Sequence, residues 1–402
     1  MSSMSYMEKL LDGVDVEWKA LGEIAEIYGG LTGKSKADFD KGNVKYIAYK
    51  NIFNNIDVDA SQLEFVKVGD NERQHEVRYG DVLFTGSSEI ADEAGMSSAV
   101  TVEFKEPVHL NSFSFGVRFN DGKLIPEFSK YLFRSRFMRA EIIKTASGVT
   151  RFNVSKARFK KIQIPIPCPE NPKKSLEIQA EIVRILDTFT ELTTELTTEL
   201  TARKKQYNYY RDQLLSFEEG EVELKTLGEV AQFRRGTAIT KKQTTLGQVP
   251  VVANGPVPTY FHGEKNREGE TIVIARSGAY AGYVSFWDKP IFLTDAFSVH
   301  PDSTILRPKF LYHVLQNKQE YIHAMKKGAG VPHVRVKEFE SYDVPIPSLT
   351  EQVRIVTILD KFDTLTKSLS EGLPREIALR QKQYEYYRDL LLSFPKPEEA
   401  AA

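Results

Sequence analysis

The chain has 402 residues, with 54 Lys and Arg against 55 Asp and Glu, and 41% of its residues are hydrophobic. This composition is typical of a soluble globular protein of two or three domains and excludes wholesale disorder. Its single cysteine excludes a disulfide framework and a cysteine-ligated zinc site. No apolar run is long enough to cross a membrane, and the first residues do not resemble a signal peptide, so we expect a cytoplasmic protein.

The chain is internally duplicated. A segment containing Leu-Gly-Glu at 16–25 returns at 222–231. The motif Ile-Pro-Ile-Pro at 164–167 returns as Val-Pro-Ile-Pro at 344–347. The material between these motifs differs in length and residue type between the two copies. Each copy is therefore predicted to contain a variable globular segment framed by similar ends.

A second pair of repeated motifs follows each globular segment. Gln-x-x-Ile-Val-x-Ile-Leu-Asp at 179–187 returns at 352–360, and Lys-Gln-Tyr-x-Tyr-Tyr-Arg-Asp at 205–212 returns at 382–389. Four collinear matches indicate a two-domain duplication. The expected layout is an N-terminal segment with the first globular domain at 1–167, a long helix at 168–220, the second globular domain at 221–347, a second long helix at 348–394 and a flexible tail at 395–402.

Apolar residues recur every three or four positions from about 175 to 217, with no Gly or Pro after Pro172. This predicts a helix roughly 60 Å long. A second helix over about 350–394 repeats the stripe, and Gly372 and Pro374 predict a break or kink in it. The two stripes can pack against each other in an antiparallel coiled coil, or each helix can pack only on its own globular half. The predicted helix-pair core is Ile182, Ile185, Phe189, Val356, Leu359, Phe362, Leu365 and Leu369.

The variable segments are predicted to mix strands and helices. Short apolar runs between turn residues predict strands at 44–47, 81–84, 113–117, 271–275 and 297–299. Segments 128–144 and 310–326 are each predicted to be a single amphipathic helix. The fold class is therefore α+β in each half.

Three tandem Thr-Glu-Leu-Thr units occupy the middle of the first helix. Each unit adds about 6 Å of helix, so the repeats are interpreted as a spacer between the two domains, with a merely solvated helix as the alternative. The spacer residues are Thr190, Glu191, Leu192, Thr194, Glu195, Leu196, Thr198, Glu199 and Leu200.

Enzyme motifs are mostly rejected. The glycine-rich segment 29–35 has the wrong spacing for a P-loop, and no dinucleotide, serine-hydrolase or metalloprotease signature occurs. Glu103-x-Lys105 has the spacing of many nucleases but lacks their usual neighbours. We expect no catalytic residue, no metal site and no cofactor-binding site in this chain.

Clusters of basic residues in the sequence favour DNA binding. They crowd the segment 130–161, where Glu141 is the one acid, and gather again near 234–242 and 321–337. Such cations neutralise phosphates, and Arg, Asn and Ser beside turns can reach base edges; solvated surface charge is the alternative. The candidate DNA-binding residues are Lys34, Lys36, Ser87, Arg151, Asn153, Lys156, Arg158, Lys160, Arg234, Arg235, Lys241, Lys242, Asn254, Arg276, Ser277, Tyr280, His333, Arg335 and Lys337.

The duplicated plan closely resembles the specificity subunits (HsdS) of type I restriction-modification systems, and the tandem repeats resemble those of the type IC subfamily. The resemblance covers residues 4–394. It implies two pseudo-symmetric target recognition domains, 16–165 and 222–345, each reading half of a bipartite, asymmetric site in double-stranded DNA. It also implies that two long antiparallel coiled-coil helices separate the domains and set the half-site spacing.

The resemblance further implies partners. Two methyltransferase subunits (HsdM) would dock on the helices and bring S-adenosylmethionine, and restriction subunits (HsdR) would bring ATP and Mg²⁺, leaving this chain without an active site. A stand-alone DNA nuclease or methyltransferase with duplicated domains is one alternative, and a purely structural coiled-coil adaptor is another.

Overall fold

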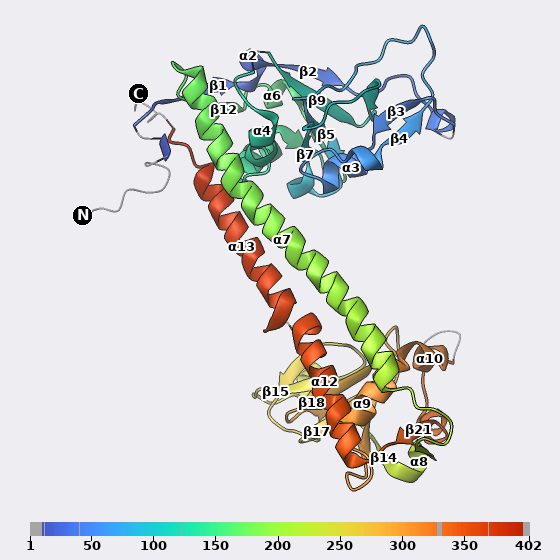
Figure 1. Cartoon of the computed structure of the whole chain (residues 1–402). Helices are drawn as coiled ribbons and strands as arrows, with labels where there is room; N and C mark the ends of the chain where they lie inside the picture. Colours follow the sequence, from blue (N-terminus) through green and yellow to red (C-terminus); the bar gives the residue numbers. More distant parts are fainter. Residues whose placement is uncertain are drawn as a thin grey trace, which may run out of the picture. The chain divides into compact units, whose positions relative to one another are not determined.

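The structure, a computed structural model, describes residues 10–11, 13–39, 41–120, 122–327, 332–368 and 370–396. The chain divides into two compact units (Figure 1). Unit 1 comprises Met1–Glu195 and Ala378–Ala402, and unit 2 comprises Leu196–Ile377. The division between Glu195 and Leu196 falls inside the tandem Thr-Glu-Leu-Thr repeats.

The described residues of unit 1 form four small sheets. An antiparallel sheet has the order β2 (Ala25–Gly29), β9 (Ser114–Phe119), β5 (Val82–Thr85), β7 (Ser97–Ala99). A mixed sheet has the order β4 (Glu64–Val66), β3 (Val44–Ile47), β8 (Val108–Leu110). The other two sheets are β1 (Val16–Ala20) with β12 (Gln163–Pro167), and β10 (Ala146–Ser147), β11 (Phe152–Val154), β6 (Ser87–Ser88).

Short helices connect these strands. They are α2 (Leu21–Ile24), η1 (Lys36–Phe39), α3 (Tyr49–Asn54), η2 (Ala60–Gln62), η3 (Ala91–Glu93), α4 (Pro126–Leu132), α5 (Arg136–Thr145) and α6 (Lys156–Phe159).

Unit 2 repeats the same strand order. Its antiparallel sheet is β14 (Ala231–Arg235), β20 (Ala296–Pro301), β17 (Glu270–Ala275), β18 (Val284–Asp288), and its mixed sheet is β16 (Tyr260–His262), β15 (Val249–Val252), β19 (Phe292–Leu293). A third sheet joins β13 (Glu223–Thr226) to β21 (Asp343–Ile346). The short helices are α8 (Leu227–Val230), η4 (Lys241–Gln243), α9 (Pro308–Asn317), α10 (Gln319–Ala324) and α11 (Val336–Glu340). The structure therefore confirms the duplication and the α+β class.

The repeated motifs pair with each other. In unit 1, β1 runs antiparallel to the Ile-Pro-Ile-Pro strand, with Trp18 opposite Pro165. In unit 2 the equivalent pairing places Leu224 opposite Pro345. Proline lacks an N–H and is tolerated in such two-stranded edge pairs. Each pair closes its globular segment by joining the beginning of that segment to its end.

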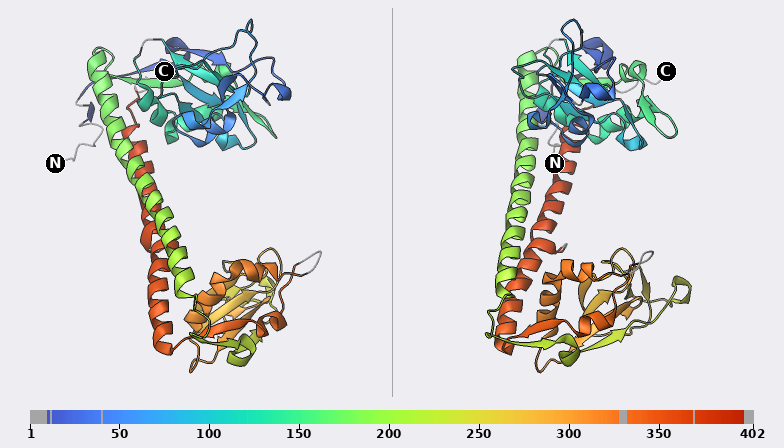
Figure 2. Two further views of the ribbon diagram at one scale, coloured as in Figure 1. Left: turned by 45° about the vertical axis from the view of Figure 1, so that its right-hand side comes forward. Right: turned by 90° about the vertical axis from the view of Figure 1, so that its right-hand side faces the viewer.

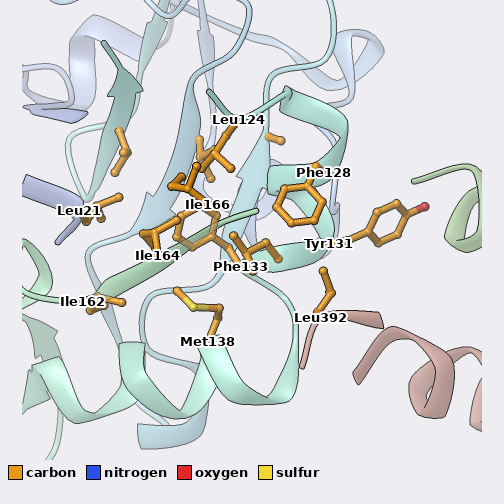
Figure 3. Close-up of a cluster of buried hydrophobic side chains, with 14 of the residues drawn as sticks. Leu21, Leu124, Phe128, Tyr131, Phe133, Met138, Ile162, Ile164, Ile166 and Leu392 are labelled. Carbon is orange, nitrogen blue, oxygen red and sulfur yellow. The ribbon is translucent and has the colours of Figure 1, made fainter. Parts of the chain in front are cut away.

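The core of unit 1 is rich in aromatic rings (Figure 3). Phe84 stacks on Phe115 at 5.4 Å between ring centroids and meets Phe133 and Phe159 edge-on. All four rings are at most 1% exposed. Leu392, from the end of the chain, joins the same cluster, so the C-terminal part of the chain completes the first globular half.

One long helix, α7 (Pro172–Leu214), passes through both units, and a second long segment is divided into α12 (Leu349–Lys367) and α13 (Gly372–Leu391). In unit 1, Phe189 of α7 stacks on Tyr387 of α13. In unit 2, the Phe362 ring of α12 contacts the rings of Tyr207 and Tyr210 of α7. Figure 2 shows the ribbon of α7 running beside α12 there. The helix pair predicted from the sequence is thus formed in each unit, largely by aromatic contacts.

The predicted helix-pair core has two roles. Ile182 and Leu359 are fully buried and belong to the core clusters of unit 1 and unit 2, respectively. Ile185 packs against the first cluster, and Val356 and Phe362 against the second. The apolar stripe therefore also anchors each helix to its globular half. Leu365 is half-buried, and Leu369 lies outside the described residues.

The predicted interruption of the second helix is confirmed. Gly372 at the start of α13 has φ +73°, and a Cβ there would lie 2.3 Å from the backbone oxygen of Thr364. Only glycine fits both requirements. The tail expected at 395–402 begins with Pro395, whose carbonyl accepts a hydrogen bond from the Trp18 indole, and with Lys396, whose ammonium lies over the Trp18 ring. Residues 397–402 lie outside the described residues.

A buried glutamine from each repeat fixes the helix to its domain. Gln179 accepts a hydrogen bond from the backbone N–H of Ile125, the residue preceding α4, and donates to the carbonyl of Lys123. Gln352 accepts from the N–H of Arg307, the residue preceding α9, and donates to the carbonyls of Ile305 and Pro347. Both side chains are completely buried. The repeated glutamine therefore caps the first helix that packs on the long one.

The two amphipathic helices predicted at 128–144 and 310–326 are each broken in two, so that prediction was wrong. Ser135 ends the first run because its hydroxyl bonds to the carbonyl of Leu132 and caps the next helix at the N–H of Met138. In unit 2 the break falls at Lys318, whose φ of −100° and ψ of 18° leave the helical region. Helical periodicity continues across both breaks, so the pattern of apolar residues alone hides them.

The Thr-Glu-Leu-Thr units are helical throughout. Threonine hydroxyls bond to carbonyls four residues back, as Thr194 does to Thr190 and Thr201 to Thr197. This satisfies the β-branched side chains within the helix. Leu192, Leu196 and Leu200 are half-buried. The segment is therefore a regular rod whose length is set by the number of repeats.

Candidate nucleic-acid interface

In unit 1 a short ribbon carries three of the predicted residues. Asn153 in β11 lies opposite Ser87 in β6, and Arg151 donates from Nε to the Ser87 hydroxyl at 3.0 Å. Arg151 and Asn153 are exposed, whereas Ser87 is 6% exposed. The ribbon thus presents a guanidinium and an amide to solvent from a fixed backbone.

Unit 2 has an equivalent ribbon. Ser277 pairs with His333, and the N–H of Val334 donates to the carbonyl of Arg276. In unit 1 the N–H of Val154 donates in the same way to Gly86. The Ser277 hydroxyl donates to the carboxylate of Asp295 at 2.5 Å. Sequence reasoning placed Arg276, Ser277 and His333 in one set, and the structure brings them together.

A basic pocket of about 540 Å³ borders the ribbon of unit 2. Its charged lining comes from Arg235, Arg276, His333, Arg335 and Lys337, all predicted candidates, together with Lys327. Lys327 pairs with Glu338 at 2.7 Å. A concave surface lined mainly by cations favours phosphates and the acceptor edge of guanine.

A pocket of about 450 Å³ borders the ribbon of unit 1, and its lining differs. Ser87 and Arg151 meet the aromatic rings of Tyr49 and Phe113 there. The hydroxyl of Tyr49 donates to the carbonyl of Ser87, and the Arg151 guanidinium lies 5.6 Å from the centroid of Phe113. Sequence reasoning missed this aromatic wall because it searched for cations and amides.

Two arginines of the basic run 130–161 face inward, so the prediction of a cationic surface is wrong for them. Arg134 donates to the carbonyls of Ile52, Phe53, Asn55 and Ser97. Arg139 donates to those of Asp92, Ala94 and Gly95. Burial lowers the pKa of each guanidinium to about 10, with a smaller contribution at Arg134 from the charge of Arg139. These guanidiniums organise loops rather than contact a phosphate.

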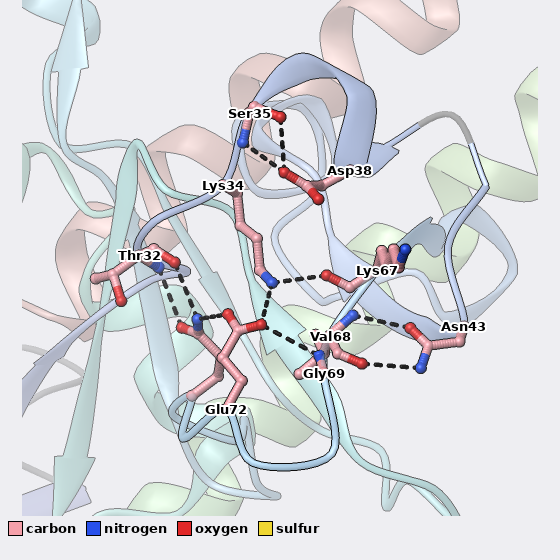
Figure 4. A network of polar contacts seen from close by, with 10 residues as sticks. Thr32, Lys34, Ser35, Asp38, Asn43, Lys67, Val68, Gly69 and Glu72 are labelled. Carbon is pink, nitrogen blue, oxygen red and sulfur yellow. Dashed lines mark hydrogen bonds and ion pairs between the residues drawn. The ribbon is translucent and has the colours of Figure 1, made fainter.

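Lys34 is also committed to its own loop (Figure 4). Its ammonium pairs with the Glu72 carboxylate at 2.5 Å and donates to the carbonyl of Lys67, and its side chain is only 5% exposed. This cation holds the pKa of Glu72 down at about 2, with further hydrogen bonds from Gln74 and Gly69. The network fixes the loop between β2 and β3, and Lys34 is not available to a phosphate.

The remaining candidates of unit 1 occupy exposed positions. Lys36 begins η1, Lys156 begins α6 beside Gly29, and Lys160 follows α6 beside Gly22. Arg158 donates to the Ser147 hydroxyl at 2.9 Å.

In unit 2, Arg234 is exposed on β14, and Lys241 and Lys242 lie in η4, the counterpart of η1. The Asn254 amide lies beside Gly278 of the ribbon turn, and Tyr280 is 50% exposed. Asn254 is thus beside the ribbon turn, and Tyr280 is exposed two residues further along it.

A histidine and two carboxylates gather between α9 and α12. Ligand atoms of His313, Asp360 and Asp363 lie within 4.8 Å of one another, although their spacing in the sequence did not suggest a cluster. Lys309 pairs with Asp360 at 3.5 Å and Lys367 with Asp363 at 2.7 Å. These ammonium groups supply the positive charge that a cation would bring, so the cluster is interpreted as a bond between helices.

Comparison with known protein families shows which family this chain resembles. A family model described as "Type I restriction modification DNA specificity domain" matches residues 13–204 and 219–379, one match for each copy of the duplication. The chain therefore belongs to the family of type I restriction-modification DNA specificity subunits. No helix among the described residues is long and apolar enough to cross a membrane.

Individual relatives span the whole chain. The specificity subunit of the type I restriction enzyme EcoR124I/EcoR124II of Escherichia coli is 40% identical over 425 residues, which cover 99% of either chain. The EcoprrI specificity subunit of Escherichia coli is 35% identical over 390 residues, covering 92% of this chain and 93% of that one.

Solved structures share the fold. The S subunit of a type I restriction-modification system from M. genitalium is 18% identical with a TM-score of 0.59, covering 96% of this chain and 98% of that one. A chain from a type I system whose structure concerns complex assembly and conformational transition is 16% identical with a TM-score of 0.64, covering 94% and 97%. At these identities the likeness shows the fold alone.

Proposed function

We propose that each globular half of this chain reads one half of a bipartite, asymmetric target in double-stranded DNA. The observation that carries the proposal is a repeated ribbon, formed beside the same strand order in both units, on which several side chains differ between the two copies. Arg151 and Asn153 stand on the first ribbon, and Arg276 and His333 on the second. Two domains with the same backbone arrangement but different pocket-lining side chains can read two different base sequences.

The long helices serve two further roles in this proposal. The number of Thr-Glu-Leu-Thr units sets the gap between the half-sites, and the repeated tyrosine motif docks two methyltransferase subunits. Tyr209 and Tyr386 occupy equivalent places in that motif and are 58% and 65% exposed. Large exposed aromatic side chains are typical anchors of protein interfaces, and their repetition offers two equivalent surfaces.

Catalysis belongs to the partners. Methyltransferase subunits would bring S-adenosylmethionine, and restriction subunits would bring ATP and Mg²⁺. Glu103 and Lys105, the support for a stand-alone nuclease, are exposed on the segment between β7 and β8. Among the described residues, the one group of side chains arranged as metal ligands does not include Glu103.

The test is selection from a random duplex library by the chain assembled with its methyltransferase partner, at fixed salt because phosphate contacts depend on salt. We expect two short specified blocks separated by an unspecified gap of fixed length. Recovery of one continuous block, or of no preferred sequence, would contradict the proposal. In parallel, the chain alone with DNA and Mg²⁺, or with S-adenosylmethionine, is expected to show no cleavage and no methyl transfer.

A further inference from the structure

The pocket beside the ribbon of unit 1 contains acids that phosphate binding does not explain. Glu89 and Glu93 line it together with Arg151. Within the described part of the chain, neither glutamate makes a side-chain hydrogen bond or ion pair. A carboxylate repels a phosphate, whereas it accepts a hydrogen bond from the exocyclic amine of a base. The lining therefore suits the edge of a base better than the DNA backbone.

Two half-buried arginines hold the walls of this pocket in place. Arg139 grips the carbonyls of Asp92, Ala94 and Gly95, which fixes the loop that carries Glu89 and Glu93. Arg134 grips the end of α3, the helix that presents Tyr49 and Phe53. Taking a guanidinium out of water is costly unless its donors find partners, and most of the hydrogen bonds of these two arginines go to backbone carbonyls. The pocket is thus fixed before any ligand arrives, which reduces the ordering cost of binding.

Apolar surface completes the site. Phe113 is 63% exposed and Ile90 is 55% exposed, although both border a pocket. The Arg151 guanidinium, held by Ser87, lies over the Phe113 ring. Exposed apolar side chains beside fixed donors and acceptors are what the faces and methyl groups of bases require.

We propose that this pocket reads a base that presents its exocyclic amine in the major groove, cytosine or adenine, in the first half-site, with Glu89 or Glu93 as the acceptor. Arg151 donates to an acceptor edge of the neighbouring base pair. The inference rests on the proposed function and deepens it by assigning a base class to one half. The cation-lined pocket of unit 2 predicts no comparable demand for an amine in the second half-site.

The experiment removes single amines from the DNA and measures binding rather than methylation. The assembled complex is titrated with duplexes of its own selected target in which one cytosine becomes 2-pyrimidinone or one adenine becomes purine. For the unaltered chain, we expect one position of the first half-site at which the loss of the amine weakens binding by about 5- to 150-fold. The variants Glu89→Met and Glu93→Met are then titrated with the same duplexes.

Combining each glutamate variant with the amine-free duplex shows which glutamate accepts the hydrogen bond from the base. The variant that lacks it should bind the normal target about 5- to 150-fold more weakly and show no further loss with the analogue at that position. Glu170→Met, an exposed glutamate at the start of the long-helix region, is the control and should behave as the unaltered chain.

Two results overturn the inference: no amine of the first half-site matters to the unaltered complex, or the loss is the same in that complex and in both variants. The amine scan on the unaltered chain decides the matter if a variant fails to assemble. If library selection instead yields no bipartite target, the proposed function fails first.

Discussion

The two globular halves share the order of their strands but differ in the side chains that line their pockets. The sheet β2–β9–β5–β7 of unit 1 recurs as β14–β20–β17–β18 in unit 2. Gln179 and Gln352 are buried and bonded alike in both. The residues that line the two pockets, in contrast, are aromatic and mixed in charge in one half and basic in the other. The framework therefore constrains backbone geometry and leaves the reading surface free to vary.

Some framework positions also use different chemistry for one task. Tyr131 donates to Asp187 at 2.5 Å in unit 1, and His313 bonds to Asp360 at 2.9 Å at the equivalent place in unit 2. Both bonds tie a domain helix to the long helix through the repeated Ile-Leu-Asp motif. The comparison teaches that the aspartate is the fixed partner and that its donor can change.

Truncation of the aromatic core is expected to give the largest difference in stability between the two units. Phe84→Ala removes a fully buried ring and should lower the unfolding free energy of unit 1 by about 3–5 kcal/mol, because a cavity remains among its three neighbouring rings. Limited proteolysis of the full chain should then cut within unit 1 first. Phe113→Ala, at an exposed ring, is the control. Equal protection of unit 1 in both variants would contradict the packing described above.

Loss of the repeated glutamine should cost each half alike. Gln179→Leu and Gln352→Leu each leave buried backbone groups without partners, which costs about 1–3 kcal/mol. Urea unfolding of each variant measures this, with Gln248→Leu at an exposed position as the control. A large loss for one variant and none for the other would show that the two glutamines are not equivalent.

Lowering the pH should destabilise unit 2 but not unit 1 at one pair of equivalent positions, His300 and Arg118. Burial, with the charges of Arg234 and Arg267, lowers the pKa of His300 from 6.5 to about 4, whereas its counterpart Arg118 remains charged and bonded to Asp81. A lowered pKa in the folded state means that stability present above pH 6.5 is lost as the pH falls toward 4.

The effect should be about 1 kcal/mol after allowance for the half-exposed ring. It is measured as the difference between the unaltered chain and His300→Gln in urea unfolding at pH 7 and pH 5. If the unfolding free energies of the two proteins change equally between pH 7 and pH 5, His300 does not cause the loss of stability.

Deletion of one Thr-Glu-Leu-Thr unit should hardly change stability but should change the target. About 6 Å of helix is lost, which corresponds to at most about two base pairs at 3.4 Å each. The selected gap should shorten while both half-sites stay the same. Replacement of one unit by Ala-Glu-Leu-Ala, which keeps the length, should leave the gap unchanged. An unaltered gap after deletion would contradict the spacer role.

Much of the framework could be predicted because the repeated motifs are the residues that pair or cap. Repetition marked the proline motifs at 164–167 and 344–347 and the two glutamines, and elementary backbone rules predicted the break at Gly372. That the proline motifs form paired strands and that the glutamines are buried came from the structure. The breaks in the domain helices at Ser135 and Lys318 could not be predicted, because the apolar periodicity continues across both breaks.

The site was predicted only in part. Ribbon residues such as Arg151 and Arg276 were found because turn chemistry and charge marked them. The inward turn of Arg134 and Arg139 depends on carbonyls from distant loops, which one sequence does not reveal. Glu89 and Glu93, which line the pocket of unit 1, were not among the candidates because a search for phosphate ligands discards acids, although their position just after Ser87 was a usable signal.

The most direct test of two independent readers is genome-wide mapping of methylated bases in cells that carry this chain with its partners. The same mapping is then done with residues 16–165 exchanged for the corresponding segment of another family member. The account predicts that one half-site changes while the other half-site and the gap are retained. A target in which both halves change together, or neither changes, would contradict it.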